Sequence, residues 1–182
     1  MNISVQKITK SNRNDFSKLH CEKNGEGWCN CVAWWVPTWN GWGERTAEQN
    51  LKLRNELFDQ GEYDDYILYT DGELVAWCQC GPRDRLKKLV SQYSLEPSSE
   101  TWAITCFVVI PSHRNKGLVR KLLEGVLTDL KEKGVHHVQG FPKRGDKLEP
   151  GEMWTGPESL FQSTGFSVEK DHPKIPVYGL RL

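Results

Sequence analysis

One stretch decides the fold of this chain: Thr101 to Lys133, which reads TWAITCFVVIPSHRNKGLVRKLLEGVLTDLKEK. Residues 101–110 form an almost unbroken apolar run, which predicts a strand buried on both faces. Residues 116–133 then place leucines and valines on one continuous face, which predicts an amphipathic helix that ends at Gly134. Because only a short loop separates the two, the stretch predicts a strand–loop–helix unit.

The loop of this unit has the features of an anion site. The first N–H groups of a helix have no partner inside the helix, and the helix dipole adds positive potential there, so phosphate is a natural ligand. Arg114 and Lys116 add charge, and Gly117 lets the backbone approach a ligand closely. The spacing matches neither the Walker loop nor the Rossmann glycine pattern. The alternative to an anion site is therefore an ordinary strand-to-helix turn that binds no ligand.

Further elements are predicted on both sides of this unit. Patterns of apolar residues predict strands at 3–8, 66–70, 73–79, 135–141, 166–169 and 177–182. Helices are predicted from about Ser11, from Thr46 to Gly61, at 83–90 and from Thr155 to Gly165, with an ordered loop at 24–43 and a polar excursion at 142–151.

Three local signals support this assignment. Asp71-Gly72 predicts a tight hairpin, because a type I′ turn needs positive φ at both positions. Thr46 with Gln49, and Thr155 with Glu158, predict capping boxes at two helix starts. Together the patterns predict one α/β (α+β) domain over residues 1–182, with a central mixed, mainly antiparallel sheet and helices on both faces.

Composition excludes several classes of protein. The 24 Lys and Arg residues balance the 24 Asp and Glu residues, so nothing favours nucleic acid or an anionic membrane as a partner. No apolar stretch is long enough to span a bilayer, and the N-terminal residues lack the apolar core of a signal peptide. We therefore expect a cytoplasmic protein.

The six cysteines are expected to be thiols rather than disulfides in that compartment. Two C-x-C pairs, Cys29 with Cys31 and Cys78 with Cys80, bring four thiols together in sequence. Zinc sites usually have a gap of two or more residues within each pair, so no metal site is predicted. Structural thiols are the favoured interpretation, and a cysteine-based metal or redox protein is the minority alternative.

The segment from Val109 to Leu123, VIPSHRNKGLVRKLL, resembles the central motif of the GNAT superfamily of acyl-CoA N-acyltransferases, Arg/Gln-x-x-Gly-x-Gly/Ala. Arg114 and Gly117 match this motif, whereas Val119 stands where the family usually has a small residue. A later segment, LFQSTGF from Leu160 to Phe166, resembles the family's late helix ending in Gly-Phe. The element order also fits, so the resemblance covers nearly the whole chain.

The resemblance implies a splayed sheet and acetyl-CoA as cosubstrate. The pyrophosphate would lie on the loop, and the pantetheine arm along the end of the strand, with a backbone N–H there polarising the acetyl carbonyl. The implied cofactor residues are Phe107, Val108, Val109, Arg114, Asn115, Lys116, Gly117, Leu118 and Val119. The acceptor would be a primary amine of a small molecule, or of a protein or peptide, that attacks directly in a ternary complex. A monomer or a homodimer is expected.

The family's usual proton donor is missing at the matching position. Members often use a Tyr on the late helix to protonate the leaving thiolate, and here that position is Phe161. Either another group such as Tyr178 does this, or the thiolate leaves without help. A non-catalytic acyl-CoA-binding or sensor module on the same fold is therefore the alternative to an enzyme.

The usual general base is missing as well. Many members use a Glu on the central strand, and the matching position is close to Ala103. Glu100 lies near but points to the opposite face of a regular strand, so we expect it to be solvated. His136 and His137 face opposite ways on the next strand, so one of them is expected to approach the cleft. No catalytic residue is assigned from the sequence.

Five tryptophans crowd the stretch 28–42, and this cluster needs an explanation. In the family, the segment around the first two helices covers the acceptor side. Trp28, Trp34 and Trp35 are therefore candidate substrate-binding residues, since aromatic walls bind cationic or ring-bearing amines. The alternative is a hydrophobic lid beside the core.

Overall fold

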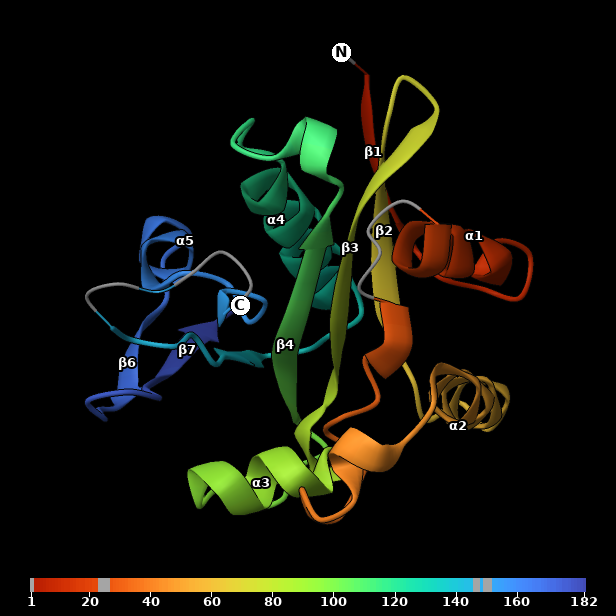
Figure 1. Cartoon of the computed structure of the whole chain (residues 1–182). Coiled ribbons are helices and arrows are strands. Elements are labelled where there is room, and N and C mark those ends of the chain that lie inside the picture. The colour runs from red at the N-terminus through yellow and green to blue at the C-terminus, as the bar shows by residue number, and fades with distance from the viewer. Residues whose placement is uncertain (1, 23–26, 146–147, 149–151) are drawn as a thin grey trace.

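The structure is a computed structural model that describes residues 2–22, 27–145, 148 and 152–182, without the side chains of Cys21 and Glu22 (Figure 1). A seven-stranded sheet runs in the order β1-β2-β3-β4-β5-β7-β6. Its strands are β1 Ile3–Lys7, β2 Asp65–Thr70, β3 Glu73–Pro82, β4 Thr101–Val109, β5 His137–Gly140, β6 Ser167–Lys170 and β7 Val177–Arg181. Every neighbouring pair is antiparallel except β4 and β5, which confirms the mixed, mainly antiparallel sheet.

Helices cover both faces of the sheet, as predicted. Figure 1 shows α1 and α2 on one side of the long strands and α4 on the other, with α3 at the end of β3 and β4. The α-helices are α1 Arg13–Ser17, α2 Ala47–Asp59, α3 Lys87–Tyr93, α4 Leu118–Glu132 and α5 Glu158–Ser163. Short helical turns complete the set: the π-helix η1 Lys18–Glu22 and the 3-10 helices η2 Gly27–Cys29, η3 Trp42–Glu44, η4 Arg83–Arg85 and η5 Pro111–His113.

The sheet divides at its centre. Residues Thr101–Ile104 of β4 pair with β5, whereas Cys106–Val109 pair only with β3 on the other side. In Figure 1 the strands β5, β7 and β6 swing away from β4. This divergence confirms the splayed sheet and leaves one edge of β4 without a neighbouring strand.

The strand–loop–helix unit forms as its sequence predicts. β4 is buried along most of its length, and the buried face of α4 consists of Leu118, Leu122, Leu123, Val126 and Leu130. α4 begins at Leu118 rather than at residue 116, because Gly117 precedes it with φ +73, outside helical geometry.

The two predicted capping boxes have opposite outcomes. The Thr46 hydroxyl accepts from the Gln49 N–H at 3.2 Å, and the Gln49 side chain accepts from the Thr46 N–H at 2.9 Å, so the first box is confirmed. The second is wrong, because α5 begins at Glu158 after an extended Pro157. Gly156 has φ +88, which breaks the helix that a box at Thr155 requires. The Thr155 hydroxyl is buried and bonds to no group among the described residues.

Other predicted boundaries shift by a few residues. The helix predicted at 83–90 is a 3-10 turn followed by α3, and β3 continues to Pro82. Asp71 and Gly72 have φ of 49 and 84, which confirms the predicted hairpin. Residues 24–26 of the tryptophan-rich loop, and 146–147 and 149–151 of the polar excursion, lie outside the described residues. No helix in the described part of the chain is long and apolar enough to cross a membrane.

Candidate functional site

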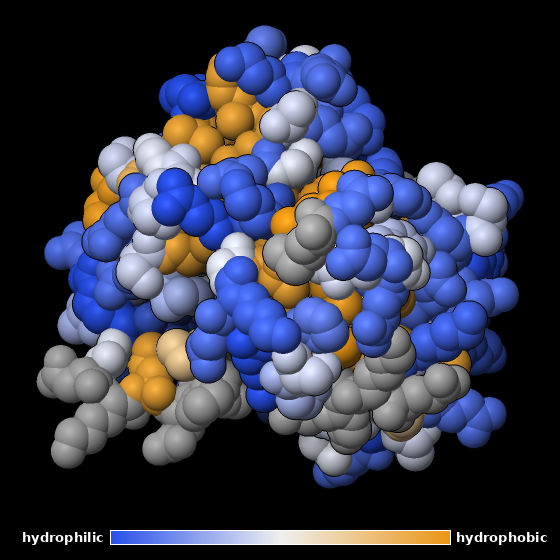
Figure 2. Space-filling model, turned by 90° about the horizontal axis from the view of Figure 1, so that it is seen from above, coloured by the Kyte–Doolittle hydropathy of each residue, from blue (hydrophilic) through white to orange (hydrophobic). Residues whose placement is uncertain are grey.

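A cavity of about 1120 Å³ opens where β4 parts from β5. The loop between β4 and α4 lies at the end of the molecule that Figure 2 faces, and hydrophobic surface shows there in hollows between hydrophilic residues. The lining comes from the N-terminal loop, β4, the start of α4 and the segment before α5: His20, Trp28, Cys29, Cys31, Ala33, Trp34, Trp39, Trp42, Cys106, Phe107, Val108, Val109, His113, Arg114, Asn115, Gly117, Leu118, Val119, Arg120, Met153, Trp154, Gly156, Pro157 and Leu160.

The N-terminus of α4 borders this cavity and has an unusual charge. Two residues of the loop, Asn115 and Gly117, have left-handed backbones with φ of 59 and 73. No side chain in the described part of the chain caps the helix, and its first turn holds no acidic residue. Arg120 and Lys121 lie there instead, paired with Glu124 of the next turn at 3.0 and 3.1 Å. The helix dipole makes this end of α4 positive, and the basic side chains add to that charge. A bound anion would therefore stabilise the N-terminus of α4.

The open edge of β4 offers backbone hydrogen-bonding groups to the cavity. The Phe107 N–H donates to the Trp154 carbonyl at 2.7 Å across the gap between β4 and the segment before α5. Since backbone groups two residues apart on a strand point to the same edge, Val109 faces the same gap. The Val109 carbonyl accepts from Arg114 Nε at 3.0 Å. An extended ligand arm can therefore pair with this edge if it replaces the Trp154 carbonyl.

Three thiols and a histidine lie together in the same cavity. The sulfurs of Cys31 and Cys106 are 3.5 Å apart, and His20 Nε2 lies 3.1 Å from the Cys31 sulfur. The Cys31 N–H donates to the sulfur of Cys29 at 3.5 Å. The cluster joins the N-terminal loop to β4, the strand at the centre of the sheet.

Burial shifts the pKa of two members of this cluster, His20 and Cys31, toward their uncharged forms. Burial, and then the nearby Arg54 guanidinium, lowers the pKa of His20 to about 3. Burial, followed by the hydrogen bond with Cys106, raises the pKa of the Cys31 thiol well above its ordinary value. The pair is therefore a neutral imidazole and a thiol, which suits an apolar ligand better than a cationic one.

Five indole rings form a continuous wall. Trp28 and Trp42 have ring centroids 5.2 Å apart, Trp42 and Trp39 6.1 Å, Trp39 and Trp34 5.7 Å, and Trp34 and Trp154 5.8 Å. Trp28 is 42% exposed and Trp39 40% exposed. Exposed rings of this size on the rim of a cavity are typical of ligand-binding surfaces.

The structure brings most of the predicted site residues together. Those that line the cavity are Phe107, Val108, Val109, Arg114, Asn115, Gly117, Leu118, Val119, Trp28 and Trp34. Lys116 is not among the lining residues. Trp35 is also absent from the lining and stacks on Tyr63, with ring centroids 4.6 Å apart, beside the core.

Neither Phe161 nor Tyr178 reaches the cavity lining. Phe161 is fully buried, between Phe107 and Phe166. The Tyr178 hydroxyl donates to Glu158 Oε1 at 2.7 Å. The Tyr178 hydroxyl is thus bonded to Glu158, and Tyr178 is not among the described residues that line the cavity.

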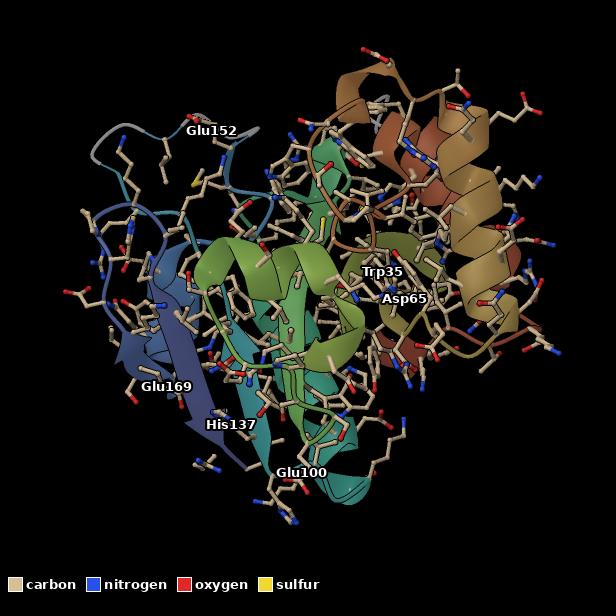
Figure 3. All side chains as sticks on the ribbon, turned by 90° about the horizontal axis from the view of Figure 1, so that it is seen from below. Trp35, Asp65, Glu100, His137, Glu152 and Glu169 are labelled. Atoms are coloured by element: carbon tan, nitrogen blue, oxygen red, sulfur yellow. The ribbon has the colours of Figure 1, made fainter. Side chains whose placement is uncertain are left out.

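The predicted strand candidates lie elsewhere too. Glu100, His136 and His137 line a separate cavity of about 510 Å³ at the other end of β4. His137 Nε2 lies 2.7 Å from Glu169 Oε1. His137 is on β5 and Glu169 is on β6, so this contact crosses β7, which lies between these strands in the sheet (Figure 3). The structure places neither histidine in the larger cavity. Ala103 is buried in a side cluster of the core.

Sequence reasoning missed His20, Cys106, Met153 and Trp154. These residues lie on three separate segments, since Met153 and Trp154 are adjacent, and only the fold brings them to one cavity. The C-x-C spacing drew attention to Cys31, but no sequence signal indicated its contact with Cys106.

Comparison with known proteins identifies the class of protein that this fold and site define. The profile of the Acetyltransferase (GNAT) family matches residues 28–141, which is more than half of the chain. The chain belongs to this family of acetyltransferases. None of the curated proteins matches it at a significant level.

Solved structures share the fold over the full chain at low identity. An N-acetyltransferase from Staphylococcus aureus Mu50 is 14% identical, with a TM-score of 0.59 over 100% of this chain and 99% of that one. The paiA N-acetyltransferase from Thermoplasma acidophilum, in complex with coenzyme A, is 13% identical with a TM-score of 0.58 over 100% of both chains. The yncA protein from Salmonella typhimurium, with its cofactor acetyl-CoA, is 17% identical with a TM-score of 0.57 over 99% and 94%.

Proposed function

We propose that this chain is an N-acetyltransferase that uses acetyl-CoA as cosubstrate and transfers the acetyl group to a primary amine. One observation carries the proposal: a single cavity joins the uncapped, basic N-terminus of α4 to the open edge of β4. Family membership and structural neighbours that contain coenzyme A or acetyl-CoA support it.

The proposed cofactor site uses mostly backbone. The N–H groups from Arg114 to Val119 hold the pyrophosphate, and the side chains of Arg114 and Arg120 add positive charge. Gly117 supplies the left-handed turn that aims these groups into the cavity. The pantetheine arm lies along residues 107–109, and the acetyl carbonyl at its end takes the place of the Trp154 carbonyl at the Phe107 N–H.

The proposed reaction is a direct displacement in a ternary complex. A neutral amine attacks the acetyl carbonyl, a C–N bond forms, the C–S bond breaks with its electron pair on sulfur, and the nitrogen loses one proton to water. The N–H of Phe107 is the donor placed to stabilise the developing oxyanion. Because Phe161 has no hydroxyl and Tyr178 is held by Glu158, we propose that the CoA thiolate leaves without a tyrosine proton donor.

A non-catalytic acyl-CoA-binding module is the second candidate, and Phe161 is the observation that favours it. Release of CoA from acetyl-CoA, measured by chromatography across a panel of amines, separates the two. Chromatography is preferable to a thiol reagent because the cysteine thiols of Cys29 and Cys31 line the cavity and would add to the signal. Amine-dependent release supports the enzyme, whereas tight acetyl-CoA binding with no release from any amine identifies the binding module.

A further inference from the structure

The cavity has an acceptor end, where the indole wall meets β4 at Cys106 and Phe107, before the strand reaches the α4 loop. We infer that this end, formed by Trp28, Trp34, Trp42, Trp154 and the thiol cluster, takes an aromatic amine of low basicity, such as an arylamine. The inference rests on the proposed function, because it names the acceptor of the same reaction.

The first argument is the shape and chemistry of the wall. Consecutive indole contacts run from Trp28 on the rim to Trp154, which bonds the backbone of β4 through its carbonyl. Large exposed apolar side chains in the described part of the chain are few, namely Trp28, Trp39 and Val168, and two of the three belong to this wall. Flat aromatic ligands offer both stacked and edge-to-face contacts to such rings.

The second argument is charge. Among the lining residues that the structure describes, none is Asp or Glu. The cations Arg114 and Arg120 lie at the α4 end, and the Lys88 ammonium sits 5.2 Å from the Trp39 ring centroid. A polyamine would thus meet cations and apolar rings here, with no carboxylate from this lining to pair with its charges.

The third argument is the protonation state of the attacking nitrogen. Only a neutral amine attacks, and an alkylamine resembling lysine, with a pKa of about 10.4, is neutral in fewer than roughly one molecule in a thousand at pH 7. His20 is the buried base of this end, but its Nε2 is already bonded to Cys31 and its pKa lies far below 7. An arylamine arrives neutral, so its reaction needs no general base.

The fourth argument is a buried donor without a partner. Trp34 is buried on the lining, and its Nε1 makes no hydrogen bond with any described group. A buried N–H in this state is destabilising, and a ligand with an acceptor atom relieves that cost. His20 Nδ1 is in the same condition. A ring amine that carries a hydrogen-bonding heteroatom fits these groups.

The test is a panel of four amines in the CoA-release assay: 5-aminoindole, tryptamine, cyclohexylamine and spermidine. The first two share the indole ring and differ in basicity, and the last two lack an aromatic ring. We expect kcat/KM for 5-aminoindole to exceed that for spermidine at least tenfold, with tryptamine between them. Trp28→Ala should raise KM for 5-aminoindole about tenfold and leave KM for acetyl-CoA unchanged.

Trp102→Phe is the matched control, because Trp102 lies on the smaller cavity at the other end of β4 and should change neither constant. The inference is overturned if spermidine is acetylated as fast as 5-aminoindole, if Trp28→Ala has no effect, or if no ring amine is acetylated or bound. Calorimetry with acetyl-CoA on the same preparation distinguishes failure of this inference from failure of the proposed function. Acetyl-CoA binding with spermidine as the best acceptor would refute the inference alone, whereas no binding and no release would refute the proposed function.

Discussion

At the scale of single residues, Gly117 has the most specific role in the proposed cofactor site. Its φ of +73 costs a non-glycine residue roughly 1–2 kcal/mol, and nothing lies within 4 Å of an added Cβ. Gly117→Glu therefore leaves the domain folded and puts a carboxylate where we propose the pyrophosphate. We expect acetyl-CoA affinity, measured by calorimetry, to fall at least tenfold.

Gly134→Glu is the control for this variant. Gly134 has φ +76 and open space around it, and it follows the other end of the same helix. This variant carries the same strain and charge but should keep wild-type affinity. Equal affinities in the two variants would mean that the cofactor binds elsewhere.

The buried His20 predicts a pH dependence of stability. Its pKa is about 3 in the folded protein and about 6.5 when exposed, so the unfolded state binds the proton first as pH falls below 6.5. Its contribution to the free energy of unfolding is complete above pH 6.5 and declines toward pH 3, by up to about 1.4 kcal/mol per pH unit. His20→Gln should show a flatter decline in urea unfolding between pH 7 and pH 5.

The exposed His136 provides the comparison. His136→Gln makes the same substitution at an exposed position on the smaller cavity, and both variants are measured over the same pH range. Parallel curves of unfolding free energy against pH for His20→Gln and the wild type would show that His20 is accessible to protons in the folded protein. The acceptor end would then not be apolar.

The sequence predicts the residues of the cofactor loop better than those of the acceptor end. Arg114 and Gly117 belong to one contiguous motif whose function depends on local backbone geometry. The contact between Cys31 and Cys106 spans 75 positions, so no local pattern encodes it. Amino-acid composition cannot distinguish Trp34 from Trp35, which are adjacent in the chain. Trp34 lines the cavity, whereas Trp35 packs on Tyr63.

At the scale of elements, the two predicted capping boxes make a paired test. Thr46→Ala removes a real cap of α2 and should cost about 1 kcal/mol of unfolding free energy. Thr155→Val removes a buried hydroxyl without a partner and should be neutral or stabilise by about 1 kcal/mol. Urea unfolding with unchanged m-values measures both.

The expected result is a loss of stability in Thr46→Ala and no loss in Thr155→Val. An equal loss of stability in both would show that the Thr155 hydroxyl has a partner after all. The sequence motif is the same at both sites, and the difference is Gly156, whose positive φ stops a helix at Thr155. Capping motifs thus predict helix starts only where the next backbone conformation is helical.

At the scale of the whole molecule, the sequence predicts the mixed sheet and its covering helices because each strand and helix has a strong local pattern. The Asp71-Gly72 turn fixes the pairing of β2 with β3, and the long helix requires a crossover that makes β4 and β5 parallel. The splay follows from the family resemblance, since no local pattern reports where two parallel strands separate. The cavity exists because of that separation.

The most direct test of the central claim is calorimetric titration of the wild-type protein with acetyl-CoA. We predict saturable binding at one site per chain, displaced by coenzyme A, since the uncapped basic end of α4 and the open edge of β4 lie in one cavity. The absence of any binding heat at millimolar acetyl-CoA would contradict the proposed function.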